Sequence, residues 1–391
     1  MNYIKRSLTD ILKFTLDIFP TVTLTGPRQS GKTTLCRHLF PELPYINMEN
    51  LQTSLLFNED TVGFVNSFKN GAIFDEAQLQ PKLFNALQVV VDEDIYSGRD
   101  RKFIITGSSN LSLMTKVSES MAGRTAPLTL LPLSVHEILD FKQKNLSAGE
   151  LMFMGGYPKV WVSPEEARGL ILQSYIETYV ERDLRQLLNV KDLNKFIKFL
   201  GLCAGRIGTE LNRNSLAVET GVTIATVDSW LSVLETSYIV WFLKPWSTNL
   251  NKRLTKSPKL YFYDTGLLCN ILGIIDPSQL DFYPLKGAIF ENMVVNEFVK
   301  MAFNKGKKPK MSFYRDKTGR EIDLILEESD GLHLFEIMAS TAFNPDYFKN
   351  IRYFEKNFPD KVISASIIYD GETFKNGNPL SGIFNFRHQI H

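Results

Sequence analysis

The residues best suited to chemistry in this chain lie in one short stretch, from Gly26 to Thr33. It reads Gly-Pro-Arg-Gln-Ser-Gly-Lys-Thr and fits the phosphate-binding pattern G-x-x-x-x-G-K-[ST] without a gap. The two glycines let the backbone turn so that successive N–H groups face phosphate oxygens. In this pattern Lys32 reaches the β- and γ-phosphates, and the Thr33 hydroxyl is a ligand of Mg²⁺. The alternative is a glycine turn that matches the pattern by chance.

The elements that must position this stretch are a strand before it and a helix after it. Four of the five residues from Thr21 to Thr25 are β-branched, which is typical of a strand. A helix is expected to run on to Phe40 and to stop at Pro41. Its N-terminus would carry a partial charge of about +0.5, which favours phosphate binding. This context predicts a nucleotide site rather than a chance match.

A second candidate motif is the apolar run from Gly71 to Phe74, which is followed by two carboxylates, Asp75 and Glu76. A buried strand would carry Asp75 to its carboxyl end, where it can hold Mg²⁺ through water. Glu76 can then polarise the water that attacks the γ-phosphate. An acidic pair after a strand usually just begins a solvated loop. Because this pair follows a complete phosphate loop, we predict Thr33 and Asp75 as metal ligands and Glu76 as the base.

A third strand-like run, from Lys102 to Thr106, ends in the polar cluster Gly107-Ser108-Ser109-Asn110. Ligands of open α/β sheets bind at the carboxyl ends of strands, so the cluster is a candidate γ-phosphate sensor; a plain Gly-Ser turn is the alternative. Arg124 is either an arginine finger or a helix cap. The predicted catalytic residues are Lys32, Glu76 and Arg124. The predicted nucleotide-binding residues are Gly26, Pro27, Arg28, Gln29, Ser30, Gly31, Lys32, Thr33, Thr34 and Ser108.

Composition sets the bounds on fold and location. With 391 residues, 44% hydrophobic and 22% charged, the chain reads as a globular protein of two or three domains. Its formal net charge of +1 excludes a wholly basic nucleic-acid coat. The three cysteines, Cys36, Cys203 and Cys269, form neither a disulfide framework nor a metal motif, which favours a reducing cytoplasm. No run approaches the ~18 apolar residues of a membrane span, so no membrane partner is expected.

The chain resembles AAA+-type ATPases of bacteria and archaea that carry a winged-helix segment and a C-terminal nuclease-like domain. The resemblance covers nearly the whole chain and rests on stretches such as GPRQSGKTTL, AIFDEAQLQPKLFNALQVVVDE, FIITGSSN, YIETYVERDL and FYRDKTGREIDLIL. It implies an α/β fold with a P-loop parallel sheet, and Asp75 and Glu76 in the roles given above. The expected domains are 1–150 (AAA+-like ATPase), 151–275 (helical and winged-helix) and 276–391 (restriction-endonuclease-like α/β).

The middle of the chain is predicted to be helical. Helices over residues 215–220 and 225–235, followed by strands over 238–245 and 259–264, resemble a winged helix. The second helix offers Asp228 and Glu235 but no basic residue, which favours protein packing. The loop between the strands favours nonspecific contact with DNA or RNA phosphates instead, through Lys252, Arg253, Lys256 and Lys259. Upstream, Arg182 and Arg185 are on a solvated helix face or contact nucleotide across a subunit interface.

The last third of the chain resembles a large nuclease superfamily whose metal site combines a helix glutamate, a strand aspartate and a strand E-x-K triplet. The matching residues are Glu291, Asp323 and Glu336. Methionine stands at position 338, where the superfamily has its lysine, so the resemblance implies a nuclease-like domain that no longer cuts. Lys317 or Arg320 are candidate substitutes for the lysine.

Together these residues predict a cytoplasmic ATPase that binds ATP and Mg²⁺. One interpretation is a homo-oligomeric ring that acts as a motor or remodeller on nucleic acid. The other is a nucleotide-controlled switch or scaffold for protein partners. The basic loop favours the first interpretation, and the acidic second helix and near-zero net charge favour the second.

Overall fold

The computed structural model describes residues 3–107, 120–179, 193–249, 256–373 and 381–389. Within these ranges no helix is both long enough and apolar enough to cross a membrane. The chain folds into two compact units. The first comprises Met1–Leu133, Thr236–Tyr238 and Ala302–Lys307, and the second comprises Ser134–Glu235, Ile239–Met301 and Lys308–His391. Two short segments of the later chain therefore belong to the first unit.

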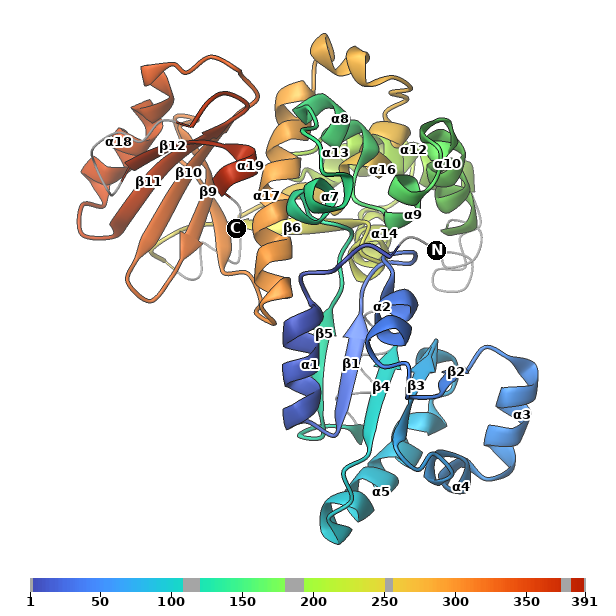
Figure 1. Ribbon diagram of the computed structural model, residues 1–391. Coiled ribbons are helices and arrows are strands. Elements are labelled where there is room, and N and C mark those ends of the chain that lie inside the picture. The colour runs from blue at the N-terminus through green and yellow to red at the C-terminus, as the bar shows by residue number, and fades with distance from the viewer. Residues whose placement is uncertain (1–2, 108–119, 180–192, 250–255, 374–380, 390–391) are drawn as a thin grey trace. The chain divides into compact units, whose positions relative to one another are not determined.

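The first unit is built on a five-stranded parallel sheet in the order β2-β3-β4-β1-β5 (Figure 1). Its strands are β1 (Thr21–Thr25), β2 (Tyr45–Asn47), β3 (Gly71–Asp75), β4 (Lys102–Thr106) and β5 (Thr125–Thr129). Because every neighbouring pair is parallel, the carboxyl ends of all five strands lie at one edge of the sheet. The phosphate-binding pattern follows β1 and the acidic pair closes β3, so both motifs lie at this edge.

Alternate side chains of these strands form two hydrophobic clusters, one on each face of the sheet. Phe74 of β3 belongs to the cluster that includes residues of α3, α4 and α5, whereas Ile73 belongs to the cluster with α1 and α2. The elements are α1 (Thr9–Ile18), α2 (Lys32–Leu39), α3 (Leu51–Glu59), α4 (Thr61–Asn66), the 3-10 turn η1 (Ala77–Leu79) and α5 (Lys82–Ser97). Because helices cover both faces of this sheet, its central strands are buried along their whole length, as β1 and β3 are.

The second unit contains a helical part. Its elements are α7 (Val135–Lys142), α8 (Ala148–Met154), α9 (Pro158–Val162), η2 (Glu165–Ala167), α10 (Arg168–Tyr179), α12 (Leu193–Ala204), α13 (Arg213–Thr220), α14 (Ile224–Thr236), α16 (Thr265–Ile271) and η4 (Pro277–Asp281). A left-handed turn at Gly221 connects helix α13 to helix α14. Trp230 of α14 packs against Phe196 and Phe199 of α12, so the three helices form one bundle.

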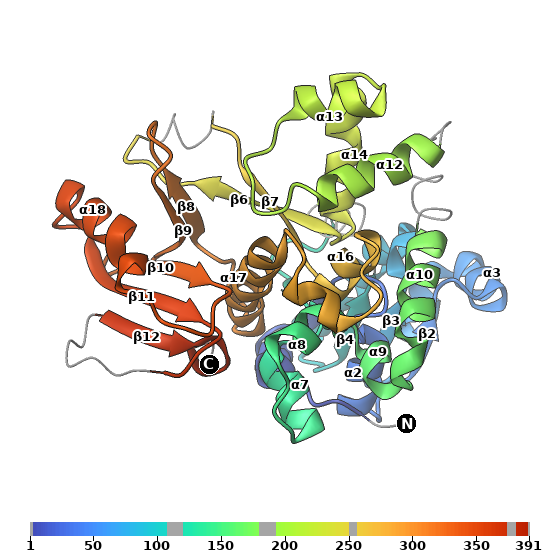
Figure 2. The same cartoon turned by 90° about the horizontal axis from the view of Figure 1, so that it is seen from above.

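The second unit also contains a seven-stranded mixed sheet in the order β12-β11-β10-β9-β8-β6-β7. Its strands are β6 (Val240–Pro245), β7 (Lys259–Phe262), β8 (Met311–Arg315), β9 (Glu321–Glu327), β10 (Leu332–Met338), β11 (Val362–Tyr369) and β12 (Ser381–Asn385). The accompanying helices are α17 (Lys286–Asn304), η5 (Pro345–Phe348), α18 (Lys349–Asn357) and α19 (Phe386–Gln389). Figure 2 shows α17 and α18 on opposite sides of the sheet. Accordingly, Leu334 of β10 clusters with α18, and its neighbour Phe335 contacts Phe298 of α17.

Several predicted elements are confirmed. The strand expected at Lys102–Thr106 has these bounds, and the helices expected over residues 215–220 and 225–235 lie within α13 and α14. The sequence places the β6–β7 pair in a winged helix apart from the C-terminal domain. In the structure β6 pairs antiparallel with β7 and also parallel with β8, so the pair extends the C-terminal sheet and covers an edge strand that would otherwise be unpaired. The division of the chain into three domains stays a prediction.

Candidate functional site

The phosphate-binding pattern forms a tight loop between β1 and α2. Gly26, Gln29 and Gly31 have positive φ values of 143°, 59° and 95°, a region that glycine enters at no steric cost. A Cβ atom on Gly26 would lie 2.1 Å from the carbonyl oxygen of Leu130, so no larger residue fits at this position. Gly31 is the N-cap of α2, and the first N–H groups of that helix therefore belong to the loop.

Two polar side chains of the loop are buried. The Lys32 ammonium donates hydrogen bonds to the carbonyl oxygens of Gly26 at 2.9 Å and Pro27 at 2.8 Å. Burial lowers the pKa of Lys32 to about 8, while the charges of Glu76 and Asp75 act in the opposite direction. The Ser30 hydroxyl is fully buried and has no hydrogen-bond partner among the described residues. A buried ammonium and an unpartnered hydroxyl in a glycine loop fit a phosphate group.

Asp75 is the centre of the polar contacts at the carboxyl edge of the sheet. Its Oδ2 atom accepts hydrogen bonds from the hydroxyls of Thr33 at 2.7 Å and Tyr45 at 2.8 Å, and its Oδ1 atom accepts one from the Thr106 hydroxyl. Burial, together with the hydrogen bond to Asp75, raises the pKa of Tyr45. The structure thus brings together Thr33 and Asp75, the two predicted metal ligands. A carboxylate and a hydroxyl are oxygen donors of the kind that Mg²⁺ prefers.

The other predicted site residues differ in their surroundings. Glu76 follows Asp75 with a left-handed φ of 54°, and its Oε2 atom accepts a hydrogen bond from Gln78 at 2.5 Å. Such backbone strain costs about 1–3 kcal/mol and is typical of ligand sites. Pro27 is buried, Arg28 is half-buried, and Gln29 and Thr34 are exposed. Ser108, Ser109 and Asn110 lie outside the described residues.

Three residues at this site were not predicted from the sequence. Arg6 is buried, and its guanidinium donates hydrogen bonds to the carbonyl oxygens of Ser30 at 2.7 Å and Leu131 at 2.6 Å. It therefore ties the phosphate loop to the chain that leaves β5. Tyr45 and Thr106 are the other two, and the hydroxyl of each donates a hydrogen bond to Asp75. The sequence signal for Thr106 is its place at the end of a predicted strand, because the ends of parallel strands lie at one edge of the sheet.

Arg124, the candidate arginine finger, is paired within its own unit. Its Nη2 atom lies 2.8 Å from Oδ2 of Asp92 on α5, and this hydrogen bond lowers the pKa of Asp92. Arg124 also donates a hydrogen bond to the carbonyl oxygen of Ala122 at 3.1 Å. To reach a nucleotide, the guanidinium would have to leave the carboxylate of Asp92. The alternative fingers Arg182 and Arg185 lie outside the described residues.

Comparison with known proteins agrees with this geometry. Residues 19–139 match a family described as an AAA domain, and residues 146–278 and 286–380 match two domains of unknown function, DUF8612 and DUF4143. The uncharacterized protein Rv2008c of Mycobacterium tuberculosis is 30% identical to the chain over 377 residues, which cover 94% of this chain and 80% of that protein. The chain belongs to the same family as Rv2008c.

Other relatives of this Rv2008c family member are more distant. The uncharacterized protein MJ1544 of Methanocaldococcus jannaschii is 24% identical over 331 residues, covering 77% of this chain and 70% of that protein. The Walker-type ATPase PABY2304 of Pyrococcus abyssi, a solved structure, is 16% identical with a TM-score of 0.48, covering 69% of this chain and 96% of that one. The AAA-domain match coincides with the parallel sheet and its phosphate loop, so the first unit is an AAA-type P-loop ATPase domain.

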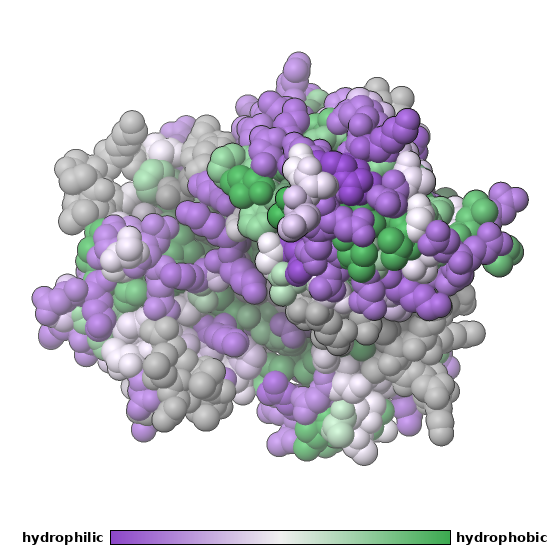
Figure 3. Space-filling model, turned by 90° about the horizontal axis from the view of Figure 1, so that it is seen from below, coloured by the Kyte–Doolittle hydropathy of each residue, from purple (hydrophilic) through white to green (hydrophobic). Residues whose placement is uncertain are grey.

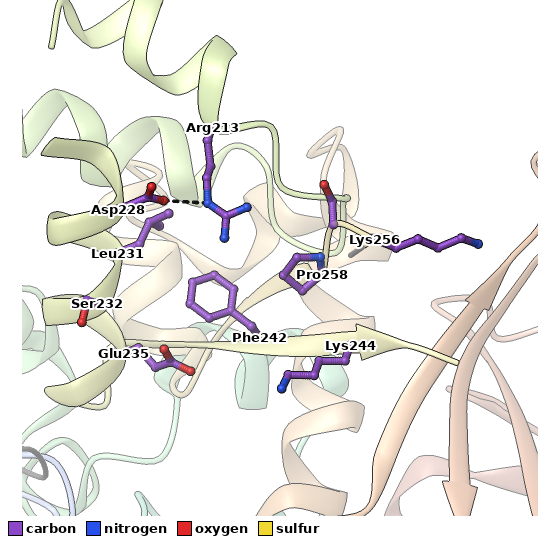
Figure 4. A pocket seen from close by; sticks show the side chains of 10 residues that line it. Arg213, Asp228, Leu231, Ser232, Glu235, Phe242, Lys244, Lys256 and Pro258 are labelled. Atoms are coloured by element: carbon purple, nitrogen blue, oxygen red, sulfur yellow. Dashed lines mark hydrogen bonds and ion pairs between the residues drawn. The ribbon is translucent and has the colours of Figure 1, made fainter. Parts of the chain in front are cut away.

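Helices α13 and α14, here termed the helix-turn-helix segment, border a pocket of about 440 Å³ (Figure 4). The lining side chains are Arg213, Asp228, Leu231, Ser232, Glu235, Phe242, Lys244, Lys256, Ser257 and Pro258. The Arg213 guanidinium donates a hydrogen bond to Asp228 at 2.7 Å, and the Phe242 ring lies between this pair and the side chains of Glu235 and Lys244 in Figure 4. Cations therefore stand beside both acidic residues of α14, and the pocket carries charges of both signs rather than a uniformly basic surface.

One of the four basic residues predicted to contact nucleic acid is buried and cannot reach it. Lys259 is only 1% exposed, and its ammonium lies 2.9 Å from Oε1 of Glu291 and also contacts Glu321. The prediction that Lys259 binds nucleic-acid phosphates is wrong, because its ammonium is buried and forms ion pairs with Glu291 and Glu321. Lys256 is exposed. Lys252 and Arg253 lie outside the described residues.

Of the carboxylates expected from the nuclease resemblance, Glu291 and Asp323 lie close enough to Lys259 to raise its pKa, and Glu336 lies beside Asp323. Glu291 accepts hydrogen bonds from Lys259 and from the Tyr261 hydroxyl. Burial raises the pKa of Asp323 to about 7; the charge of Glu291 adds to this effect and that of Lys259 opposes it. Burial and the nearby charge of Asp323 raise the pKa of Glu336. Met338 packs against the apolar cluster beneath α18, so the ammonium of this site comes from β7 rather than from β10.

Replacing the buried ammonium tests this assignment. Lys259→Met should lower the free energy of unfolding by about 3–5 kcal/mol, because Glu291 and Glu321 lose the cation that compensates their burial. The matched control is Lys256→Met, which removes an exposed ammonium three residues away and should change stability by about 0.5 kcal/mol or less. Urea unfolding followed by tryptophan fluorescence reports on the second unit, which contains all four tryptophans. Equal midpoints for the two variants would contradict the assignment.

Proposed function

We propose that this chain binds ATP with Mg²⁺ in its AAA domain and hydrolyses it. The observation that carries the proposal is the Asp75 carboxylate, which accepts the Thr33 hydroxyl at the N-terminus of α2. One ligand from the phosphate loop and one from the end of β3 are thereby fixed at the same edge of the sheet. A magnesium ion held by these two residues would supply positive charge to the phosphoryl oxygens.

The roles proposed for the other residues follow from their contacts. The ammonium of Lys32 would exchange the carbonyl oxygens of Gly26 and Pro27 for phosphate oxygens. Glu76 would accept the proton of the attacking water, because it directly follows the metal-ligating residue and its carboxylate is oriented by Gln78. The Tyr45 and Thr106 hydroxyls would hold Asp75 in place. Each proposed role therefore belongs to a residue whose contacts at the end of the sheet are described above.

Two substitutions separate binding from hydrolysis. Lys32→Ala should abolish tight ATP binding, because the phosphates lose the ammonium of the loop. Glu76→Gln should keep binding and lower turnover by about 10²–10⁴-fold, because it removes the base and spares the metal ligands. The matched control is Glu59→Gln, an exposed glutamate at the end of α3. ATP affinity by titration and phosphate release give the two readouts. Equal turnover in Glu76→Gln and wild type would rule out Glu76 as the base.

We further propose that the chain assembles into a homo-oligomeric ring that moves or remodels nucleic acid. Lys244 and Lys256 are exposed beside the helix-turn-helix segment and offer contacts to phosphates. The AAA domain leaves apolar side chains on its surface, including Leu51 and Leu55 of α3, which are 73% and 59% exposed. Figure 3 shows such apolar areas (green) on a mostly hydrophilic face. Exposed apolar residues on the AAA domain support contact with a second copy.

A nucleotide-controlled switch for protein partners is the second candidate. It is favoured by the burial of Lys259, which removes one cation from the basic set, and by the acidic residues of the pocket in Figure 4. The two candidates differ in one measurement. A nucleic-acid motor should hydrolyse ATP faster when single- or double-stranded DNA or RNA is added, and Lys244→Glu with Lys256→Glu should remove the stimulation. Turnover that no nucleic acid changes would favour the switch.

For the C-terminal sheet we propose a nuclease-like fold that does not cleave nucleic acid. The supporting observation is that Lys259 is already bound by Glu291 and Glu321, so its ammonium is not free to stabilise an attacked phosphate. Met338 packs against the apolar cluster beneath α18 and offers no positive charge. Cleavage of DNA or RNA with Mg²⁺ or Mn²⁺ that Asp323→Ala abolishes would contradict this proposal.

A further inference from the structure

Tyr238 is an unusual residue for its place in the fold. It follows the end of α14 and has a left-handed φ of 58°. The N–H group of Ile239 bonds to the carbonyl oxygen of Leu234, which closes the helix in a motif whose left-handed residue is usually glycine. Helices α5 and α13 of this chain do end in left-handed glycines, Gly98 and Gly221. An aromatic residue is disfavoured in this conformation, so its side chain must make a compensating contact.

That contact lies inside the AAA domain. Tyr238 is 4% exposed, and its hydroxyl is 2.8 Å from the Thr25 hydroxyl. Thr25 in turn lies 3.2 Å from the Thr129 hydroxyl, so a ladder of hydroxyls joins Tyr238 to the carboxyl ends of β1 and β5. Residues Thr236–Tyr238 accordingly belong to the first unit, whereas the chain on both sides, α14 and β6, belongs to the second.

Thr25 is the last residue before the phosphate loop. Its carbonyl oxygen accepts a hydrogen bond from the N–H group of Leu130 at 2.9 Å, and its side chain is fully enclosed. The next residue, Gly26, offers the carbonyl oxygen that Lys32 binds at 2.9 Å. When phosphate oxygens take the ammonium, the Gly26–Pro27 peptide loses this partner. The end of β1 is tightly packed, so a change there is passed to the neighbouring side chain rather than absorbed.

We infer that Tyr238 is a positioning residue that couples nucleotide binding to the helix-turn-helix segment and the β6 strand that continues from it. This inference rests on the proposed ATP site. Tyr238 acts through the Thr25 hydroxyl, which lies one residue before the phosphate loop. Since residues 236–238 connect α14 directly to β6, a shift of the Tyr238 side chain displaces the ends of both elements. Coupling of this kind requires the Tyr238–Thr25 contact to differ in strength between the free and the nucleotide-bound chain.

Hydrogen exchange on the full chain, with and without Mg²⁺ and a non-hydrolysable ATP analogue, tests this inference. In the wild type, the analogue should protect residues 26–34 and change exchange in residues 224–245 by about fivefold or more. Tyr238→Phe removes only the hydroxyl and should reduce the change in residues 224–245 to less than about twofold, with loop protection kept. Thr25→Val should have the same effect from the other side of the contact.

Two control variants separate coupling from general loosening. Thr25→Ser keeps the hydroxyl and should retain the wild-type response. Thr23→Val removes a hydroxyl of β1 that pairs with Thr125 at 3.0 Å and is not part of the ladder, so it should also retain the response. A merely structural role for Tyr238 would raise exchange equally with and without the analogue. Either that result or an unchanged response in both Tyr238→Phe and Thr25→Val would overturn the inference.

The same experiment distinguishes failure of the inference from failure of the ATP site. Protection of residues 26–34 without any change in residues 224–245 would overturn the coupling and leave ATP binding intact. No protection of residues 26–34 in the wild type would overturn both. If Tyr238→Phe does not fold, Thr25→Val compared with Thr25→Ser gives the same decision, because valine has two methyl groups and no hydroxyl, whereas serine keeps the hydroxyl at this β-strand position.

Discussion

A single buried carboxylate organises the nucleotide site. Asp75 lies at the end of a fully buried strand, where an unsatisfied charge would be costly. Hydroxyls from α2, β2 and β4 satisfy it, namely those of Thr33, Tyr45 and Thr106. These hydroxyls come from separate elements of the parallel sheet and its first helix. They meet at Asp75 only because the strands end at a common edge. The order of the strands is therefore a condition for the chemistry proposed for this chain.

The second unit solves a similar electrostatic problem in another way. There the carboxylates of Glu291 and Glu321 are compensated by the ammonium of Lys259. Removing one partner of such a buried pair is costly, whereas the pair itself adds little to stability. At the AAA site the side chains that donate hydrogen bonds to Asp75 are neutral hydroxyls, and the nearby Lys32 ammonium is hydrogen-bonded to the carbonyl oxygens of Gly26 and Pro27. This contrast supports a metal at Asp75 and a structural use of the cluster around Lys259.

The sequence predicts features that depend on neighbours along the chain. The phosphate loop, the acidic pair after β3 and the strand at Lys102–Thr106 all follow from local patterns. The contacts of Arg6, Tyr45 and Lys259 do not, because their partners are 24 to 125 residues away and no spacing rule links them. Lys259 is the clearest case: its position in a basic loop predicts exposure, and only the pairing of β6 with β8 reveals its burial.

The coupling inferred above depends on one residue, Tyr238, rather than on a sequence motif. Tyr238 illustrates why such links escape sequence reasoning. A tyrosine after a helix gives no signal by itself, and its meaning depends on a left-handed backbone and on a hydroxyl partner 213 residues earlier. Function in this family member would then depend on contacts that lie outside the phosphate loop. In the proposed mechanism the loop binds the nucleotide, and the Tyr238–Thr25 contact couples nucleotide binding to the helix-turn-helix segment.

The most direct test of the central claim is ATP turnover by the purified full chain as Mg²⁺ is titrated from zero, in the presence of a chelator, to saturation. Phosphate release should require Mg²⁺ and should disappear in Asp75→Asn, since this change removes the charged metal ligand while keeping the shape of the side chain. Phosphate release that is equal with and without Mg²⁺, or that Asp75→Asn leaves unchanged, would contradict the account.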